Sequence, residues 1–399
     1  MKILYHHRTR AEDAQGIHIK SLQDAWTALG HEVREVSPVD ARNNAAPKTT
    51  GKAENKAENK TSPAVKKAAD QKHSEGRSPL GSVIYETLSL GYNIYGAARL
   101  RRAIREFNPG MIYERYSLNL CAGAYIAQRR RLPFVLEVNA PLVDEMAKES
   151  GLVGQGVARR CEKWVLESAT KVVVVSQVLR DHFTSSGIDT SRFQVMHNGI
   201  DPHQFHPQVD AAPVREQYAL GHHCVIGFVG WMRQWHRLDL LLEAFAALPN
   251  RDQCEVLLVG DGPALSGLRE RAAALGIAAQ VHFTGPVAHD KIPMHIAAMD
   301  ITVLPSIPAY ASPMKLFEYL AMGKAVIMPD QQNLREVVHD GENGILIPAS
   351  DNGVSRALHL LASDQALRQR LAGAAAATIR DGSFYWTENA RRVLAGLPL

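Results

Sequence analysis

The sequence predicts an α/β protein with two Rossmann-like domains, each built on a parallel sheet that helices cover on both faces. The chain has 399 residues, more than one ordinary core contains, so two domains of about 150–200 residues are expected. Short apolar runs alternate with stretches of helical periodicity, which is typical of parallel sheets. The alternation restarts at "CVIGFVG" (residues 224–230), which indicates a second domain.

The first half opens as a β-α-β unit. Ile3–Tyr5 and Val33–Val36 are expected strands, and the stretch between them has helical spacing and ends at Gly30. After a long amphipathic helical stretch that begins with "PLGSVIYETLSL", further strands are expected in "GMIYERY", "PFVLEVN", "KVVVVS" and "FQVMHNGID". We assign residues 1–205 to this N-terminal domain.

A basic segment, residues 41–79, interrupts the first half. It contains nine Lys or Arg and four Asp or Glu, a net charge of +5 in a chain whose total is +4. The tandem "KAEN" and the scarcity of large apolar residues predict a flexible insertion in a loop. A basic arm that contacts a membrane surface or a partner is the alternative. Because the rest of the chain is not basic, we expect no binding of nucleic acid.

The second half continues with expected strands in "CEVLLVGDG", "VHFTG", "ITVLP", "KAVIMP" and "GILIP", separated by helical stretches. We assign residues 206–383 to this C-terminal domain. The four cysteines are far apart in sequence and form no CxxC pair, which predicts neither a zinc site nor a disulfide framework. The chain has no long apolar run, and "MKILYHHRTR" lacks the core of a signal peptide. We therefore expect a cytoplasmic protein and leave open a peripheral contact with the inner face of the membrane.

The stretch "SPMKLFEYLAMGKAVIMPD" (residues 312–330) predicts a short helix that opens on an anion site and ends at Gly323. Ser312 suits the N-cap and Pro313 suits the first helical position. The amides that this start leaves free belong to Met314, Lys315 and Leu316. The Lys315 charge adds to this site, and Glu318, one turn later, suits the hydroxyls of a ribose. This order fits a nucleotide diphosphate; an ordinary i, i+3 ion pair is the alternative.

A cationic loop follows the strand that ends at Gly230. "FVGWMRQWHRLDLLLEAF" places Arg233, His236 and Arg237 beyond the carboxyl end of that strand, where open α/β sheets bind ligands. Packing of its two tryptophans is the alternative interpretation, and "VGDGP" (residues 259–263) is either a ligand loop or a plain tight turn. The chain has no GxGxxG, GxxxxGK[ST], HExxH or GxSxG pattern, which argues against a dinucleotide oxidoreductase. It also lacks the Asp-x-Asp that metal-dependent sugar transfer often uses.

Five stretches together make the chain resemble the retaining glycosyltransferases of family 4. They are "VVVVSQVLRDHF", "VMHNGIDPHQFHP", "FVGWMRQWHRLDLLLEAF", "VGDGP" and "SPMKLFEYLAMGKAVI", in this order. The resemblance implies the GT-B fold, in which two Rossmann-like domains face each other across a cleft. It implies that a nucleotide-diphosphate sugar binds mainly to the C-terminal domain and that the acceptor docks on the N-terminal domain. The last helix, within residues 384–399, is then expected to pack back on the N-terminal domain.

The resemblance also implies site residues on the donor side, with an SPxK…E motif. Glu318 matches the second acid of the family's E-x7-E motif, which binds the ribose, whereas Tyr310 stands in place of the first acid. Arg233, His236 and Lys315 are the candidates for neutralising the diphosphate and hence for catalysis. The other donor-side candidates are Ser312, Pro313, Met314, Leu316, Gly230, Gly260 and Gly285.

On the acceptor side, "IYERYSL" and "EVNAP" resemble a subgroup that assembles polysaccharides. The candidates near the cleft are Gly16, His18, Arg115, Glu137 and Asn139, the last at a position where many family members carry a histidine. The implied function is a retaining hexosyltransferase that needs no metal or cofactor and joins a nucleotide sugar to a glycan or lipid-linked acceptor. A nucleotide-sugar epimerase with the same fold and a catalytically silent binding protein for sugar nucleotides or glycans are the alternatives.

Overall fold

The computed structural model describes residues 1–9, 14–37, 79–149, 151–348 and 352–398. The insertion predicted at residues 41–79 therefore lies outside the described residues, except for Pro79, where a helix begins. The chain forms two compact units. Unit 1 consists of Met1–Val174, Leu179–Val195 and Ala390–Leu399, and unit 2 consists of Val175–Val178 and Met196–Asn389.

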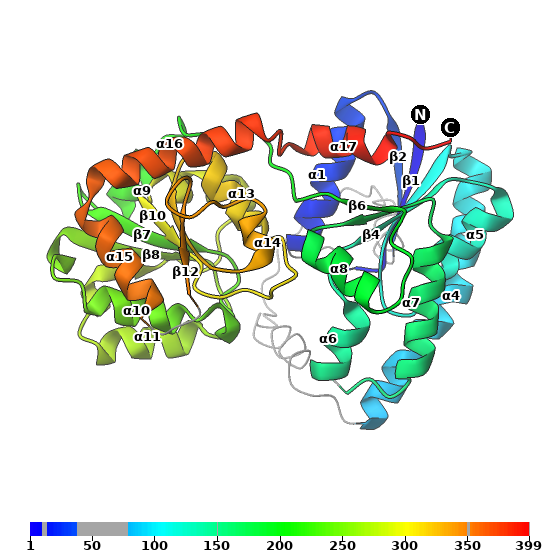
Figure 1. Cartoon of the computed structure of the whole chain (residues 1–399), viewed down its shortest axis with the longest axis horizontal. Coiled ribbons are helices and arrows are strands. Elements are labelled where there is room, and N and C mark those ends of the chain that lie inside the picture. Colours follow the sequence, from blue (N-terminus) through cyan, green and yellow to red (C-terminus); the bar gives the residue numbers. More distant parts are fainter. Residues whose placement is uncertain (10–13, 38–78, 150, 349–351, 399) are drawn as a thin grey trace, which may run out of the picture. The chain divides into compact units, whose positions relative to one another are not determined.

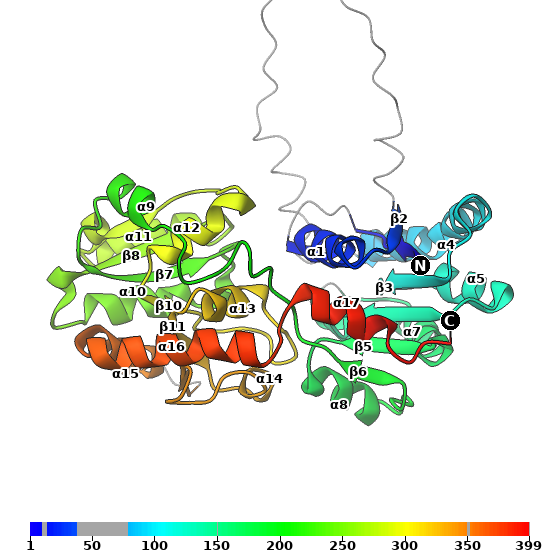
Figure 2. The same ribbon diagram turned by 90° about the horizontal axis from the view of Figure 1, so that it is seen from above.

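Unit 1 is built on a parallel sheet with the strand order β2-β1-β3-β4-β5-β6 (Figures 1 and 2). Its strands are β1 (Lys2–His6), β2 (Glu32–Val36), β3 (Met111–Arg115), β4 (Phe134–Val138), β5 (Lys171–Val174) and β6 (Phe193–Val195). The helices between them are α1 (Ala14–Ala28), α4 (Pro79–Phe107), α5 (Ala122–Arg130), α6 (Leu142–Glu149), α7 (Gln155–Ser168) and α8 (Gln177–Ser185). Every residue of β3 and β4 is buried, as expected for strands that helices cover on both faces.

Unit 2 repeats this plan with the strand order β12-β11-β10-β7-β8-β9. Its strands are β7 (Cys224–Val229), β8 (Cys254–Val259), β9 (Val281–Phe283), β10 (Ile301–Val303), β11 (Ala325–Pro329) and β12 (Ile345–Ile347). Its helices are α9 (Ala212–Gln217), α10 (Leu238–Ala246), α11 (Leu265–Ala274), α12 (Ile292–Ala297), α13 (Met314–Ala321), α14 (Gln332–Arg335), α15 (Gly353–Ser363) and α16 (Gln365–Asp381). The prediction of two Rossmann-like parallel sheets is confirmed.

Each unit has its own apolar core. Trp26 and Tyr113 are fully buried in unit 1, and Phe228, Phe245 and Phe317 are fully buried in unit 2. Aromatic side chains of this size account for a large part of the apolar area that folding removes from water. Among the residues that the structure describes, no helix combines the length and the apolar character that crossing a bilayer requires.

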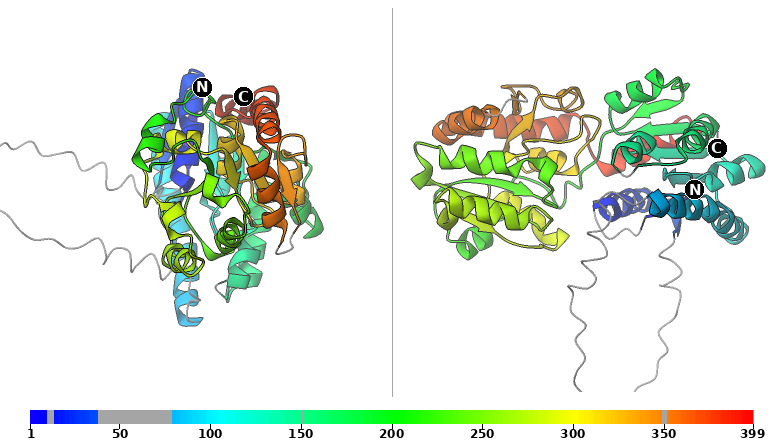
Figure 3. Two further views of the ribbon diagram at one scale, coloured as in Figure 1. Left: turned by 90° about the vertical axis from the view of Figure 1, so that its left-hand side faces the viewer. Right: turned by 90° about the horizontal axis from the view of Figure 1, so that it is seen from below.

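The last helix, α17 (Trp386–Leu394), begins in unit 2 and ends in unit 1 (Figure 3). On the unit 1 side, the indole of Trp26 donates a hydrogen bond to the carbonyl of Ala390 at 3.1 Å. The ammonium of Lys171 donates to carbonyls at the end of the helix, including that of Ala395 at 2.6 Å. A cation at a helix C-terminus is stabilised by the exposed carbonyls and the helix dipole, so Lys171 anchors the end of the chain to unit 1.

The start of α17 is held in unit 2 by backbone contacts. Ile200 and Tyr385 form a β-bridge, and the amide of Trp386 donates to the carbonyl of Ile200 at 3.3 Å. Gly199 makes this approach possible, because a Cβ at this position would lie 2.6 Å from the amide nitrogen of Trp386. A backbone atom cannot move aside as the end of a flexible side chain can.

We expect Gly199→Ala to lower the free energy of unfolding by about 1–3 kcal/mol, the usual cost of forcing an extra methyl into a filled space. The matched control is Gly267→Ala in α11, where an added Cβ meets nothing within 4 Å. That variant should be about 0.5–1 kcal/mol more stable than wild type, because glycine is unfavourable inside a helix. Urea unfolding of both variants measures these free energies. An equal change in the two variants would contradict the close contact between Gly199 and Trp386.

Candidate functional site

The candidate residues of both units lie near the carboxyl ends of the strands, several of them where the strand order of the sheet changes direction. In unit 1, β1 lies between β2 and β3, so the segments that follow β1 and β3 diverge from one point. In unit 2, β7 lies between β10 and β8, and the segments that follow β7 and β10 diverge in the same way. Open parallel sheets bind ligands at such points, outside the carboxyl ends of the strands. In unit 2 these two segments carry His236 and Lys315.

Lys315 and His236 present two hydrogen-bond donors to the same space. Nζ of Lys315 lies 3.4 Å from Nε2 of His236. On the other side of the ring, Nδ1 accepts a hydrogen bond from the backbone amide of Arg233 at 3.2 Å, so the neutral ring carries its proton on Nε2. A charged ammonium cannot accept that proton, whereas an oxygen of a bound anion accepts from both groups. This is an arrangement suited to phosphate.

Burial shifts the pKa of both groups toward their neutral forms. The pKa of His236 falls to about 3, mainly because of burial and further because of the charges of Lys315 and Arg233. Burial also lowers the pKa of Lys315 to about 7, against the opposing effect of Glu318. The ammonium lies 4.0 Å from the centroid of the Phe228 ring, in cation–π contact. Without an anion, Lys315 therefore loses its charge near neutral pH, and a bound anion favours the charged form.

Glycines let the loops after β7 and β8 approach each other and Lys315. A Cβ on Gly230 would lie 2.9 Å from Nζ of Lys315, and a Cβ on Gly260 would lie 2.2 Å from the carbonyl oxygen of Gly230. Gly262, which sequence analysis did not single out, would bring a Cβ to 2.4 Å from a backbone oxygen of the same loop. Gly230, Gly260 and Gly262 have φ angles from 125° to 147°, a backbone conformation that favours glycine. The amide of Gly260 donates to the carbonyl of Gly285 at 3.1 Å, so the predicted glycines form one contact region.

The start of α13 differs from the prediction. Pro313, not Ser312, is the N-cap residue, with an extended backbone (φ −74, ψ 127), and the helix begins at Met314. The Ser312 hydroxyl instead accepts a hydrogen bond from the backbone amide of Asn198 at 3.5 Å. The amide of Leu316 is not free, because it donates to the carbonyl of Pro313 at 3.1 Å. The predicted anion site at the helix start thus has one donor fewer than the sequence suggested.

Glu318 lies one turn after Lys315 and is only 8% exposed. Burial raises the pKa of its carboxyl to about 7, against the effect of the Lys315 charge. The ion pair offered as the alternative for these two residues is not what the structure shows, since Lys315 contacts the Phe228 ring and His236. The neighbouring Tyr319 hydroxyl accepts from the amide of Val229 at 2.8 Å, which ties α13 to the end of β7. Gly323 ends the helix in a left-handed conformation (φ 61), as predicted.

Asn198 is a site residue that sequence analysis missed. Its side-chain amide donates to the carbonyl of Ser312 at 2.6 Å, next to the start of α13. Within the described part of the chain, its Oδ1 is buried and has no hydrogen-bond partner. The signal was present in "VMHNGIDPHQFHP", which contributed to the family resemblance without a residue being assigned. Tyr310, in place of the family's first acid, lies in a loop that Ser176 holds by donating to the Tyr310 carbonyl at 2.7 Å.

Most of the remaining side chains of the loop after β7 face solvent, although Met232 is buried. Arg233 is exposed, and its charge still contributes to the lowered pKa of His236. Trp231 and Trp235 are 52% and 44% exposed, so burial in a core does not explain them. The Trp235 ring covers His236, with ring centroids 3.9 Å apart. Arg237 is engaged by Asp239, at 3.1 Å.

In unit 1 the structure brings three predicted residues together around Glu137. Arg115, at the end of β3, is the register partner of Glu137 in β4 and donates to its Oε1. Asn139 donates to the same oxygen, and Nδ1 of His18 lies 3.6 Å from it. Gly16 lies two residues before His18, in the first turn of α1.

Two tyrosines that sequence analysis missed complete this cluster. The hydroxyls of Tyr113 and Tyr5 donate to Oε2 of Glu137 at 2.8 and 3.3 Å. Burial alone would raise the pKa of Glu137, but the charges of His18 and Arg115 together with these hydrogen bonds hold it at about 2. Both carboxylate oxygens are engaged within the protein, so Glu137 holds its neighbours in position.

We expect Glu137→Gln to lower the free energy of unfolding by about 3–5 kcal/mol at pH 7, because it leaves the Arg115 charge buried without its counter-charge. The folded-state pKa of about 2 lies below the usual 4.5, so the contribution of Glu137 is complete above pH 4.5 and is lost as the pH falls toward 2. In urea titrations, the difference in the free energy of unfolding between wild type and variant should become smaller over that pH range. A gap of constant size from pH 7 to the acid limit would contradict the ion pair.

Metal ligands and thiols form no obvious centre. The described residues contain no group of three or more His, Cys, Asp or Glu that would hold a metal ion. The four cysteines are free thiols, although Cys224 and Cys254, distant in sequence, are register partners in β7 and β8. That the reaction needs no metal stays a prediction.

Two protein-family models match the chain, one in each half. The model described as "Glycosyltransferase Family 4" matches residues 15–204, and the model described as "Glycosyl transferases group 1" matches residues 223–364. Together, these matches support a glycosyltransferase of the family 4 type.

Curated relatives are similar over part of their length. The chain is 29% identical to an α-D-kanosaminyltransferase of Streptomyces kanamyceticus, over 41% of this chain and 43% of that protein. It is 28% identical to a D-inositol 3-phosphate glycosyltransferase of Streptomyces bingchenggensis, over 67% of this chain and 62% of that protein. It is also 28% identical to a GDP-mannose-dependent α-(1-6)-phosphatidylinositol monomannoside mannosyltransferase of Mycolicibacterium smegmatis, over 49% of this chain and 53% of that protein. The chain thus spans between 43% and 62% of the length of these relatives.

Solved structures are similar over the whole chain. The structure of Anabaena Alr3699/HepE in complex with UDP has a TM-score of 0.73 at 20% identity and covers 100% of both chains. That of WaaG, a glycosyltransferase involved in lipopolysaccharide biosynthesis, has a TM-score of 0.68 at 16% identity and also covers 100% of both. These likenesses, with the two parallel sheets, show that the protein has the two-domain, Rossmann-like GT-B fold.

Proposed function

We propose that the protein transfers a hexose, with retention of configuration, from a nucleotide-diphosphate sugar to a hydroxyl of a glycan or lipid-linked acceptor. The observation that carries this proposal is the pair of donors that Lys315 and His236 present at the carboxyl end of the unit 2 sheet. One turn along α13, Glu318 adds a buried carboxylate. The order of these groups suits a diphosphate followed by a ribose.

Similar proteins support a nucleotide sugar as the donor. The mycobacterial relative is named as GDP-mannose-dependent, and structures of HepE contain UDP or UDP-glucose. WaaG takes part in lipopolysaccharide biosynthesis, which supports a role in polysaccharide or glycoconjugate assembly. The bases and sugars differ among these proteins, so the donor of this chain has to be found by experiment.

The chemistry that we propose depends on stabilising the leaving group. When the bond between the anomeric carbon and the diphosphate breaks, negative charge grows on the departing phosphate oxygen. Lys315 and His236 donate to that oxygen from fixed, buried positions, and one such donor is worth about 2.7–4 kcal/mol in the transition state. The acceptor oxygen forms its bond to the anomeric carbon, and the departing phosphate oxygen takes the proton of the acceptor hydroxyl, so no separate base is required.

Side-chain cations supply the positive charge that the diphosphate requires, and on this ground we propose a reaction without metal or cofactor. Arg233 adds an exposed charge beside the buried pair. In unit 1, we propose that Arg115 and His18, held in position by Glu137, bind the acceptor.

Lys315→Met tests this function, because it keeps the side-chain length and removes the charge. A thermal-shift screen with UDP- and GDP-sugars first finds the donor, since a ligand at 100 times its Kd stabilises by about 2.7 kcal/mol. Release of nucleoside diphosphate on addition of sugar acceptors then reports transfer. We expect kcat to fall about 100- to 1000-fold, with a smaller change in the KM for the donor.

Lys291→Met, the same substitution at an exposed lysine, is the matched control and should behave as wild type. A raised KM with an unchanged kcat would mean that Lys315 binds only the ground-state diphosphate. Interconversion of donor sugars without release of nucleotide would instead support an epimerase, and binding without any turnover would support a silent binding protein.

Glu318→Gln tests the ribose contact. Hydrogen bonds to a charged group are worth about 1.5–3 kcal/mol, so the variant should bind the donor's nucleoside diphosphate about tenfold more weakly at pH 8, above the pKa of about 7. The 2′,3′-dideoxy nucleotide should bind wild type and variant with similar affinity. Titration calorimetry with both nucleotides measures the difference, and an equal loss for the two would remove the assignment to the ribose.

A further inference from the structure

Arg8 lies just beyond the carboxyl end of β1, the strand at which the order of the unit 1 sheet changes direction. Its half-buried guanidinium lies against α4. Nη2 donates to the Ser89 hydroxyl at 2.7 Å, and Nη1 donates to the carbonyl of Leu118 at 3.3 Å. The centroids of the Tyr85 and Tyr92 rings lie 5.8 and 5.6 Å from Cζ of Arg8. All of these partners are uncharged.

The carboxylates near Arg8 are engaged by other groups. Both oxygens of Glu86, one turn before Ser89 in α4, accept backbone amides at 2.7 Å from the turn before α7. Glu114 in β3 is paired with His6. Within the described part of the chain, the hydrogen bonds of Arg8 go to one carbonyl and two hydroxyls, and no carboxylate pairs with it. A partly desolvated guanidinium keeps its charge, so it gains from a bound anion.

The guanidinium also retains hydrogen-bond donors. Its bonds to Ser89, Tyr85 and Leu118 use only the two terminal nitrogens, and Nε has no acceptor among the residues that the structure describes. An oxygen of a phosphate or a carboxylate accepts from such a donor in a charge-assisted hydrogen bond, which is about twice as strong as a neutral one. Arg8 therefore has both the charge and the donor that an anion requires.

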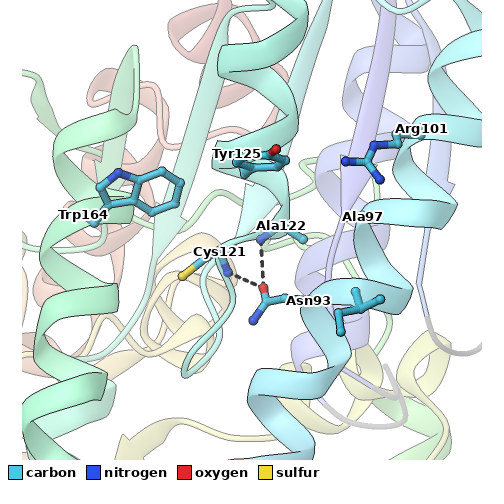
Figure 4. A pocket seen from close by; sticks show the side chains of 8 residues that line it. Asn93, Ala97, Arg101, Cys121, Ala122, Tyr125 and Trp164 are labelled. Atoms are coloured by element: carbon cyan, nitrogen blue, oxygen red, sulfur yellow. Dashed lines mark hydrogen bonds between the residues drawn. The ribbon is translucent and has the colours of Figure 1, made fainter.

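The part of α4 that holds Arg8 is fixed against α5. Oδ1 of Asn93, one turn after the serine that binds Arg8, accepts the amides of Cys121 and Ala122 at 2.7 and 2.9 Å (Figure 4). Nδ2 of Asn93 donates to the carbonyl of Asn119 at 2.7 Å, in the loop that also accepts a hydrogen bond from Arg8. The guanidinium is thus held in place before a ligand arrives, and binding costs little further ordering.

Arg8 and Arg115 lie at the same edge of the sheet, on its two faces. Glu114 and Arg115 are successive residues of β3, so their side chains point to opposite faces. His6 pairs with Glu114 and lies beside the ring of Tyr92 in α4, with ring centroids 6.5 Å apart. That ring also contacts Arg8. A ligand that reaches Arg115 at this edge therefore has a second cation beside it, on the α4 side.

We propose that Arg8 binds an anionic group, a phosphate or a carboxylate, that the acceptor carries. This inference rests on the proposed function, because it takes the ligand at this edge of unit 1 to be the acceptor. A side chain that only joined α4 to the loop after β3 would need no charge, since its partners are hydroxyls and a carbonyl. The acceptor class is then an anionic saccharide or a phosphorylated one, not a neutral glycan.

Titration with matched saccharides tests this inference. α-D-Glucose 1-phosphate and D-glucuronate carry the two kinds of anion, and methyl α-D-glucoside is neutral. Wild type should bind at least one of the anions more tightly than the neutral sugar, and the preferred anion identifies the source of the charge. Arg8→Gln should weaken that binding about 10- to 100-fold and leave the binding of the neutral sugar unchanged. Arg8→Lys, which keeps the charge without the planar fork, should recover part of the loss.

Arg251→Gln is the matched control. Arg251 is also half-buried and donates to a carbonyl, that of Ala246 at 3.4 Å, but it lies before the amino end of β8 in unit 2. This variant should bind all three saccharides as wild type does. Thermal unfolding shows whether each variant folds. An Arg8 that is only structural would change the affinity for neutral and charged saccharides alike, and that result would overturn the proposal.

Lys315→Met separates this site from the proposed donor site. Binding of glucose 1-phosphate that Lys315→Met abolishes and Arg8→Gln leaves intact would overturn the role of Arg8, as would anions that bind no better than the neutral sugar. Binding that depends on Arg8, without release of nucleoside diphosphate on addition of any acceptor, would support the anion site and contradict the transferase function. In transfer assays, Arg8→Gln should raise the KM for an anionic acceptor with little change in kcat.

Discussion

The ammonium of Lys315 and the Nε2–H group of His236 are both hydrogen-bond donors, and Nζ lies 3.4 Å from Nε2. While the lysine is charged, neither group can accept a hydrogen bond from the other. This constraint accounts for the surroundings of the pair. Gly230 lacks a side chain because the ammonium occupies that space, and the amide of Arg233 fixes the tautomer of the imidazole. Tyr319 ties the helix of Lys315 to the strand before His236. An anion would relieve the conflict, and this is the physical basis of the diphosphate site that we propose.

The parallel sheets bring these groups together. In unit 2, His236 and Lys315 follow β7 and β10, the strands between which the order changes direction, and in unit 1 Arg115 ends β3 beside Glu137 in β4. The clusters differ in their electrostatics. Glu137 in unit 1 is satisfied by Arg115, Asn139 and two tyrosines, and its pKa is low. Lys315 in unit 2 has no such compensation, and burial moves its pKa toward neutrality. The first cluster is a rigid support, whereas the second gains from a bound charge.

Sequence alone predicted what local pattern determines. The strands and the helix that ends at Gly323 follow from apolar periodicity and from a glycine in a left-handed conformation. The sequence did not predict contacts between segments that are distant along the chain. Ser312 has the chemistry of an N-cap, but its hydroxyl is taken up by Asn198, and Pro313 caps the helix instead. Tyr5 and Tyr113 look like ordinary strand residues until the order of the sheet brings both hydroxyls to one carboxylate. No spacing rule expresses such a contact.

Lys315 acts over a short distance because it is desolvated. Its interaction with a phosphate is therefore strong and little screened by salt. Such a buried cation stabilises charge that develops at one atom, which is what the proposed departure of a diphosphate requires.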